Sequence, residues 1–204
     1  MKSNIVLTSA AVLLVSMTGA NALNYQPFVG ATMGLQGVIY SDSAKDMERA
    51  TAIDLPTDFF TFGLEAGVRA GEYNQIYNGG LTLNATKSTY SSVQKKYVEQ
   101  RVASSDLFDM SVTYDNYIRI SGDKESRIDL VLGAGVGTMA YHVDAVGADS
   151  KTKWAFAPEF KMGLDFELTK SVTLSANARV VLPMRSHYEM DATYIMGGAV
   201  KYMF

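Results

Sequence analysis

The sequence predicts an all-β protein, an eight-stranded antiparallel up-and-down transmembrane β-barrel that follows an N-terminal signal peptide. Three observations predict this fold. Eight segments alternate apolar and polar residues with a period of two, as β-strands with two different faces do. These segments run for about 12 to 16 residues, whereas strands of soluble proteins are typically nearer 5 or 6. The connections alternate between long and short, as in a meander with loops at one end and turns at the other.

The N-terminus has the pattern of a secretory signal peptide, residues 1–22. Lys2 supplies the positive charge and Ile5–Met17 the short apolar core, and Ala20-Asn21-Ala22 supplies the small residues of a cleavage site. Residues 23–204 are then expected to form one barrel domain, with cleavage after Ala20 as the alternative. An N-terminal anchor is less favoured, because the apolar run is shorter than the roughly 20 residues of a membrane-spanning helix.

The composition excludes several functions. The 204-residue chain has no cysteine and only two histidines, so disulfides and thiolate metal sites are impossible, and neither a metal nor another cofactor is predicted. The net charge of −3 argues against a nucleic-acid partner, which normally requires a basic stripe.

The first three strands are expected at Pro27–Tyr40, Phe60–Ala70 and Tyr73–Ala85. In the first, apolar side chains occupy odd positions, and glycine, threonine and glutamine occupy most even ones. In the second, every position on one face is apolar. The third alternates poorly, since Gln75 falls on the apolar face and Ile76 on the polar one. The charged segment Ser41–Thr57 has no period of two, which predicts a long loop.

The next two strands are expected at Phe108–Ile120 and Arg127–His142. One face of the fourth strand is apolar except for Asn116, and the fifth sets aliphatic residues opposite Asp129 and glycines. The polar segment Ser121–Ser126 is a short turn between them. A long loop, Thr86–Ser105, is predicted before the fourth strand, and its basic residues are Lys87, Lys95, Lys96 and Arg101.

The last three strands are expected at Lys153–Phe166, Ser171–Pro183 and Asp191–Phe204, after a third loop at Val143–Thr152. The sixth strand alternates most cleanly. Pro158 lies within it and lacks a ladder donor, which predicts a bulge or a portion above the membrane at that point. An even number of strands lets the first pair with the last, so that no unpaired backbone meets lipid.

The polar face predicts which side of the barrel faces lipid. Each base placed against the bilayer midplane would cost about 2–4 kcal/mol, so the charged face is expected to line the interior and the apolar face to contact lipid. A soluble lipocalin-like barrel, with the faces reversed, is the alternative. The expected lumen charge network comprises Glu65, Arg69, Asp109, Asp115, Arg119, Asp129, Glu159, Lys161, Asp165, Arg179 and Lys201.

Aromatic residues near the strand ends are expected to form two girdles at the membrane interfaces. Those of the loop side are Phe59, Phe60, Phe108, Trp154, Phe156 and Tyr188. Those of the turn side are Tyr25, Phe28, Tyr73, Phe166, Tyr202 and Phe204.

The C-terminal strand resembles the assembly signal of bacterial outer-membrane barrels, with apolar or aromatic Val200, Tyr202 and Phe204 at alternate positions. Together with the signal peptide and eight alternating strands, it makes the chain similar to the small OmpA/OmpX-like outer-membrane barrels. This resemblance implies a place in the bacterial outer membrane, in contact with lipid and lipopolysaccharide, and assembly by the barrel-assembly machinery.

Function is less specified by the sequence. A structural or surface-interaction role is predicted, in adhesion or envelope integrity, with the basic loop as a site for lipopolysaccharide phosphates or an extracellular protein. A lipid A-modifying enzyme is one alternative, because His142 with Asp144 and Ser186-His187-Tyr188-Glu189 fall at the loop end; no catalytic residue is predicted, however. A narrow channel is the other, although eight strands enclose only enough space for side chains.

Overall fold

The computed structural model describes residues 25–51, 57–71, 75–90, 102–122, 127–145, 151–184 and 190–204. The predicted signal peptide lies outside these ranges. Within them, no helix has both the length and the apolar character needed to cross a bilayer.

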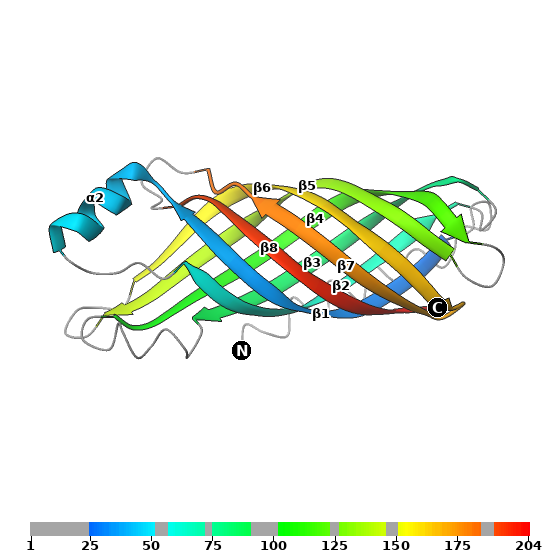
Figure 1. The fold of residues 1–204 in the computed structure, drawn as a ribbon, viewed down its shortest axis with the longest axis horizontal. Coiled ribbons are helices and arrows are strands. Elements are labelled where there is room, and N and C mark those ends of the chain that lie inside the picture. Colours follow the sequence, from blue (N-terminus) through cyan, green and yellow to red (C-terminus); the bar gives the residue numbers. More distant parts are fainter. Residues whose placement is uncertain are drawn as a thin grey trace.

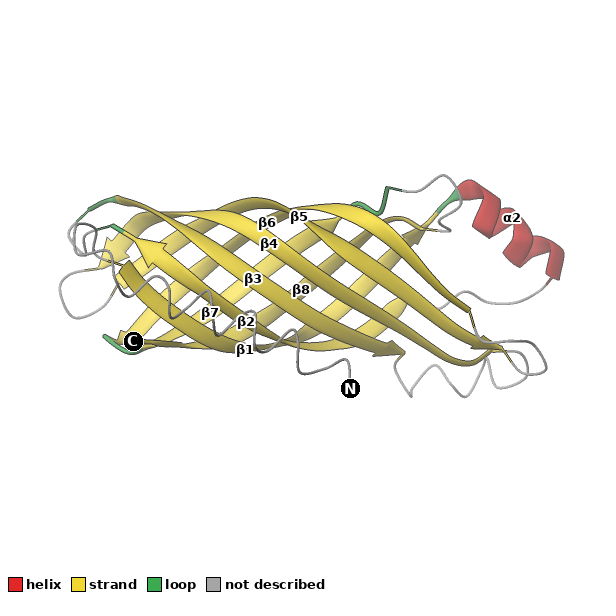
Figure 2. Ribbon diagram, turned by 180° about the vertical axis from the view of Figure 1, so that it is seen from behind, coloured by secondary structure: helices red, strands yellow, loops and turns green. Residues whose placement is uncertain are grey.

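Eight antiparallel strands close into a barrel, which confirms the predicted fold class. Each strand pairs with its neighbour in sequence, and β1 also pairs with β8, from Phe28 opposite Met203 to Tyr40 opposite Met190. Figures 1 and 2 show the strands crossing the long axis obliquely, with the helix at one end and the C-terminus at the other. The strands are β1 (Tyr25–Tyr40), β2 (Asp58–Ala70), β3 (Tyr77–Tyr90), β4 (Val102–Gly122), β5 (Arg127–Ala145), β6 (Lys151–Thr169), β7 (Val172–Val181) and β8 (Met190–Met203).

The outer face is apolar and the inner face polar, as predicted. On β2, Leu64 is 64% exposed, whereas the adjacent Glu65 is 3% exposed. The same alternation runs through β4, where Tyr114 points outward and Asp115 is fully buried. A lipocalin-like barrel would have the opposite arrangement, so that alternative is wrong.

The predicted third strand is wrong in position. Strand β3 begins at Tyr77 and continues to Tyr90, so Gln75 and Ile76 precede it and Lys87 lies within it. Regular alternation starts only at Tyr77, with Asn78 buried and Tyr77 exposed, which explains why the earlier residues fitted neither face. The connections before β4 and after β5 are also shorter than predicted, because these strands extend to Val102 and Ala145.

The segment Ser41–Thr57 contains a helix, α2 (Asp42–Thr51), where the sequence predicted only a loop. The Ser41 carbonyl accepts hydrogen bonds from the amides of Ala44 and Lys45, both at 3.1 Å, and the Ser41 hydroxyl lies 3.4 Å from the Ala44 amide. A serine at this position satisfies amides that a helix N-terminus leaves unpaired. Ala44 is buried against the barrel, so tertiary packing anchors a helix too short to be stable alone.

No bulge forms at Pro158. Its pairing with Val136 of β5 continues the register without a shift, so that part of the prediction is wrong. The Pro158 carbonyl faces β7 and accepts a hydrogen bond from the Leu182 amide at 2.9 Å. In an antiparallel ladder the N–H and C=O of one residue face the same neighbouring strand, so the N–H that Pro158 lacks would also face β7. The regular pairing of β6 with β7 ends at Glu159 opposite Val181, next to Pro158.

Two predicted girdle aromatics lie inside the barrel instead. Phe28 and Phe59 are 1% and 0% exposed, because each shares its orientation with the inward residues of its strand. Trp154, Phe156, Tyr202 and Phe204 are exposed on the outer surface. Tyr73 and Tyr188 fall outside the described residues.

Candidate functional site

The end of the barrel interior nearest the short turns is rich in arginine. Asp129 accepts hydrogen bonds from Arg69 Nη2 and Arg127 Nε, both at 2.7 Å. With the Asn78 amide oriented to suit its neighbours, its oxygen accepts from Arg127 Nη2 at 2.8 Å and Arg69 Nη2 at 3.1 Å. The Arg69 guanidinium also lies 4.6 Å from the centre of the Tyr117 ring. Arg127 was not among the predicted lumen charges, although it shares the orientation of Asp129 two residues later.

Two lysines hold the next carboxylates. Lys201 Nζ lies 2.9 Å and 3.0 Å from the two Asp165 oxygens and 3.9 Å from Glu65 Oε1. Ser175 donates to Asp165 at 2.6 Å. On the other side of the lumen, Lys161 Nζ and the Thr82 hydroxyl donate to Asp115 Oδ2 at 2.9 and 2.7 Å.

Arg179 joins two carboxylates nearer the loop end. Its Nη1 lies 3.2 Å from Asp109 Oδ2 and 3.4 Å from both Glu159 oxygens. Its Nη2 lies 3.3 Å from the Thr86 hydroxyl. All three charged side chains are at most 5% exposed. Two buried acids therefore share one guanidinium.

The predicted charges thus converge in the interior from all strands except β1 and β3. Arg119 is half-buried near the turn end, where its amide donates to the Ile76 carbonyl at 2.8 Å. When Arg127 is added, six basic side chains accompany six acidic ones. These are Arg69, Arg119, Arg127, Lys161, Arg179 and Lys201 with Glu65, Asp109, Asp115, Asp129, Glu159 and Asp165.

A neutral polar group follows on the loop side of these charges. Gln36 donates to the Thr193 hydroxyl at 3.1 Å and accepts from Ser88, which contacts the Thr61 hydroxyl at 2.5 Å. These four residues come from β1, β2, β3 and β8, so they tie together the strands on both sides of the barrel closure.

An apolar cluster fills the barrel interior at the loop end, and the sequence reading missed it. Phe59 and Tyr90 meet edge to face with their ring centres 5.9 Å apart. Ala44 of α2 joins the cluster, so the start of the helix packs against the loop end of the barrel interior. Some members, such as Val38, Ala157 and Val181, occupy inward positions of predicted strands, but Ala44, Phe59, Leu107 and Met190 lie outside the predicted strands. The buried members are Val38, Tyr40, Ala44, Phe59, Leu107, Met139, Tyr141, Ala155, Ala157, Val181 and Met190.

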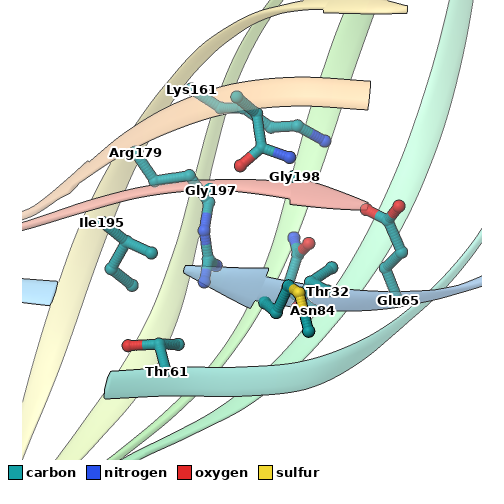
Figure 3. A pocket seen from close by; sticks show the side chains of 11 residues that line it. Thr32, Thr61, Glu65, Asn84, Lys161, Arg179, Ile195, Gly197 and Gly198 are labelled. Carbon is teal, nitrogen blue, oxygen red and sulfur yellow. The ribbon is translucent and has the colours of Figure 1, made fainter. Parts of the chain in front are cut away.

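Little free space is left among the charges. A cavity in the lumen has a volume of about 10 Å³, and its lining residues project from several strands (Figure 3). This is about the space that one water molecule needs. Within the part of the chain that the structure describes, the charged network, the neutral group and the apolar cluster therefore form a sealed interior.

Two polar contacts lie on the outer wall near the loop end. Lys87 Nζ lies 3.2 Å from Asp106 Oδ2, and His142 Nδ1 lies 2.8 Å from the Thr152 hydroxyl. The first contact joins β3 to β4 and the second joins β5 to β6. They are neighbours, because Asp106 of β4 is the register partner of His142 of β5. Lys87 therefore belongs to the barrel wall rather than to a loop.

The other predicted loop residues are not assembled into a site by the structure. Lys95, Lys96, Arg101 and the segment Ser186–Glu189 fall outside the described residues. Asp144 is placed only through its backbone, which pairs with Ser104 of β4. The predicted pairing of His142 with Asp144 therefore stays a prediction.

The residues of the predicted assembly signal lie on the outer face of β8 and just beyond it. Val200, Tyr202 and Phe204 are all exposed, and the rings of Tyr202 and Phe204 meet edge to face at 5.1 Å. The Phe204 amide donates to the Pro27 carbonyl at 2.9 Å, which extends the seam between β8 and β1.

Comparison with known proteins supports the fold. No family model matches the sequence, and no curated protein matches it. The crystal structure of neisserial surface protein A aligns with a TM-score of 0.52 at 11% identity, over 88% of this chain and 97% of that one. That of Ail, the attachment invasion locus protein of Yersinia pestis, aligns at 0.51 and 16%, over 88% and 98%. A major outer membrane protein from Thermus thermophilus aligns at 0.51 and 11%, over 89% and 100%.

A closed antiparallel barrel with an apolar exterior and a charged interior is an integral outer-membrane β-barrel. More particularly, the fold is that of the small eight-stranded outer-membrane barrels, which agrees with the OmpA/OmpX-like resemblance.

Proposed function

We propose that this protein acts at the outer surface of the bacterial cell, in adhesion or envelope integrity, and that it transports nothing through its lumen. The observation that carries this proposal is the sealed interior. Among the described residues, the ion pairs and the apolar cluster occupy the space that a solute would need, and the cavity beside them admits about one water molecule. A rigid barrel of this kind serves to hold its loops above the membrane.

The chemistry of the loop end supports an anionic partner. Lys95, Lys96 and Arg101 lie in the segment between β3 and β4, where Glu99 is the only acidic residue in residues 91–101. Phosphate or sulfate groups pair readily with such side chains. Among proteins of the same fold, Ail has been crystallised in complex with the heparin analogue sucrose octasulfate. We therefore propose lipopolysaccharide phosphates or a sulfated extracellular polysaccharide as the partner of this segment.

We propose no catalytic role for His142. Its hydrogen bond to Thr152 joins β5 to β6 on the outer wall, and this contact has a structural explanation as a cross-strand pair.

The purified protein is expected to give no conductance in planar lipid bilayers at moderate salt and voltage. The reason is that the described residues of the barrel interior leave no continuous aqueous path. The measurement is single-channel recording after confirmed insertion. Discrete current steps from the folded barrel would contradict the sealed interior.

Replacing Lys95, Lys96 and Arg101 together by glutamine is expected to reduce binding of protein-bearing vesicles to immobilised heparin several-fold, because residues 91–101 then lose all three of their positive charges. The matched control is Lys87→Gln, since the Lys87 ammonium already pairs with Asp106. Equal heparin binding by the triple variant and the wild type would contradict the proposal that this segment binds an anionic partner.

A further inference from the structure

Three residues that line the small lumen cavity each carry a buried polar atom without a hydrogen-bond partner among the described residues. These atoms are Thr32 Oγ1, Glu65 Oε1 and Asn84 Nδ2. The Lys201 Nζ atom lies 3.9 Å from Glu65 Oε1, which is beyond hydrogen-bond distance. Glu65 and Asn84 are at most 5% exposed. A buried polar group without a hydrogen-bond partner is unfavourable, so three such groups beside one cavity indicate a ligand.

The three residues lie on adjacent strands. Glu65 of β2 is the register partner of Asn84 of β3, and Thr32 of β1 is opposite Gly63, two residues from Glu65. All three residues line the same cavity, together with the glycines Gly197 and Gly198 of β8.

The donors and acceptors match one water molecule. A carboxylate oxygen accepts, an amide nitrogen donates, and a hydroxyl does either. Buried waters typically make about three hydrogen bonds, and the volume of about 10 Å³ suits a single one. A cation is disfavoured because Lys161 and Arg179 line the same cavity, and an anion is disfavoured because Glu65 does.

We propose that this cavity is a hydration site for one structural water, which donates to Glu65 Oε1, accepts from Asn84 Nδ2 and bonds the Thr32 hydroxyl. Lys161 and Arg179, which also line the cavity, belong to the two clusters around Asp115 and around Asp109 with Glu159. The water therefore lies between these two clusters and the ion pairs that Lys201 makes with Glu65 and Asp165. This inference does not depend on the proposed surface function.

The test uses the full barrel reconstituted in lipid and a crystal structure that resolves ordered water. We expect one water within about 2.6–3.2 Å of the three named atoms, together with a water cross-peak to the Asn84 side-chain amide in water-edited solid-state NMR. In Asn84→Leu both signals are expected to disappear. They should persist in Asn116→Leu, the same substitution on the exposed outer face.

An empty cavity in the wild type, an ion in place of the water, or a water unaffected by Asn84→Leu would overturn the proposal. Should Asn84→Leu fail to fold, Thr32→Val removes one partner at almost constant volume. That variant is expected to lower the water occupancy, and full occupancy there would count equally against the site.

Discussion

Replacing Arg179 by methionine is expected to destabilise the folded barrel by about 3–5 kcal/mol, the typical cost of breaking a buried ion pair from one side. Arg179 is the basic side chain in contact with both Asp109 and Glu159. Its removal leaves two carboxylates in an interior that the apolar cluster separates from the loop end. Methionine retains much of the side-chain volume, so the loss is mainly electrostatic.

The measurement is urea unfolding in lipid vesicles, followed by the fluorescence of Trp154, the only tryptophan of the chain. The control is Lys87→Met, which breaks the exposed pair with Asp106 and is expected to cost about 0–1 kcal/mol. Adding Asp109→Asn and Glu159→Gln to Arg179→Met should restore much of the stability, because no charge is then left unpaired. Equal effects of Arg179→Met and Lys87→Met would show that the lumen charges do not support the fold.

Replacing Leu64 by arginine is expected to cost about 2–4 kcal/mol, the typical penalty for a base on the lipid face near the midplane. Leu64 is central on the outer face of β2, and its register partners are the small residues Ala31 and Ala85. Neither neighbour can shield a guanidinium from lipid.

The control for Leu64→Arg is Tyr77→Arg, at the first residue of β3. Tyr77 is 71% exposed at the edge of the apolar belt, where a base is expected to cost about 0–1 kcal/mol. Unfolding midpoints in urea compare the two variants. A larger loss of stability in Tyr77→Arg than in Leu64→Arg would mean that the bilayer midplane does not lie near Leu64.

The lipid-facing and interior faces of the barrel could be predicted from the sequence, because the alternation of apolar and charged residues within a strand distinguishes the two faces. Leu64 beside Glu65, and Tyr114 beside Asp115, differ so strongly in transfer free energy that only one arrangement is tolerable in lipid. Charged side chains on the inward face then pair with whatever lies across the lumen. The partners themselves, such as Arg179 with Glu159, depend on barrel geometry and could not be predicted.

The remaining features depend on packing at the loop end. Phe59 was assigned to a girdle because an aromatic at a strand end suits a membrane interface equally well. The predicted strand starts only at Phe60, whereas β2 starts at Asp58, so Phe59 is in phase with the inward Thr61 and Glu65. Helix α2 differs from the predicted loop because the lack of a period of two in this charged segment excludes a strand but not a helix. Both errors arose where a strand or helix contacts the apolar cluster.

The arrangement of lipid-facing and interior side chains is tested most directly by NMR of methyl groups in nanodiscs that contain spin-labelled lipid. The unmodified chain supplies both lipid-facing and interior methyl groups, and β3 carries both kinds. The methyl signals of Leu64, Leu81 and Leu83 are expected to broaden strongly, because these side chains point outward toward acyl chains. The methyl signals of Thr82, Thr86 and Thr113, which are buried in the lumen, should stay sharp. Broadening of the threonine methyls with protection of the leucines would contradict the barrel orientation and the functional proposal that depends on it.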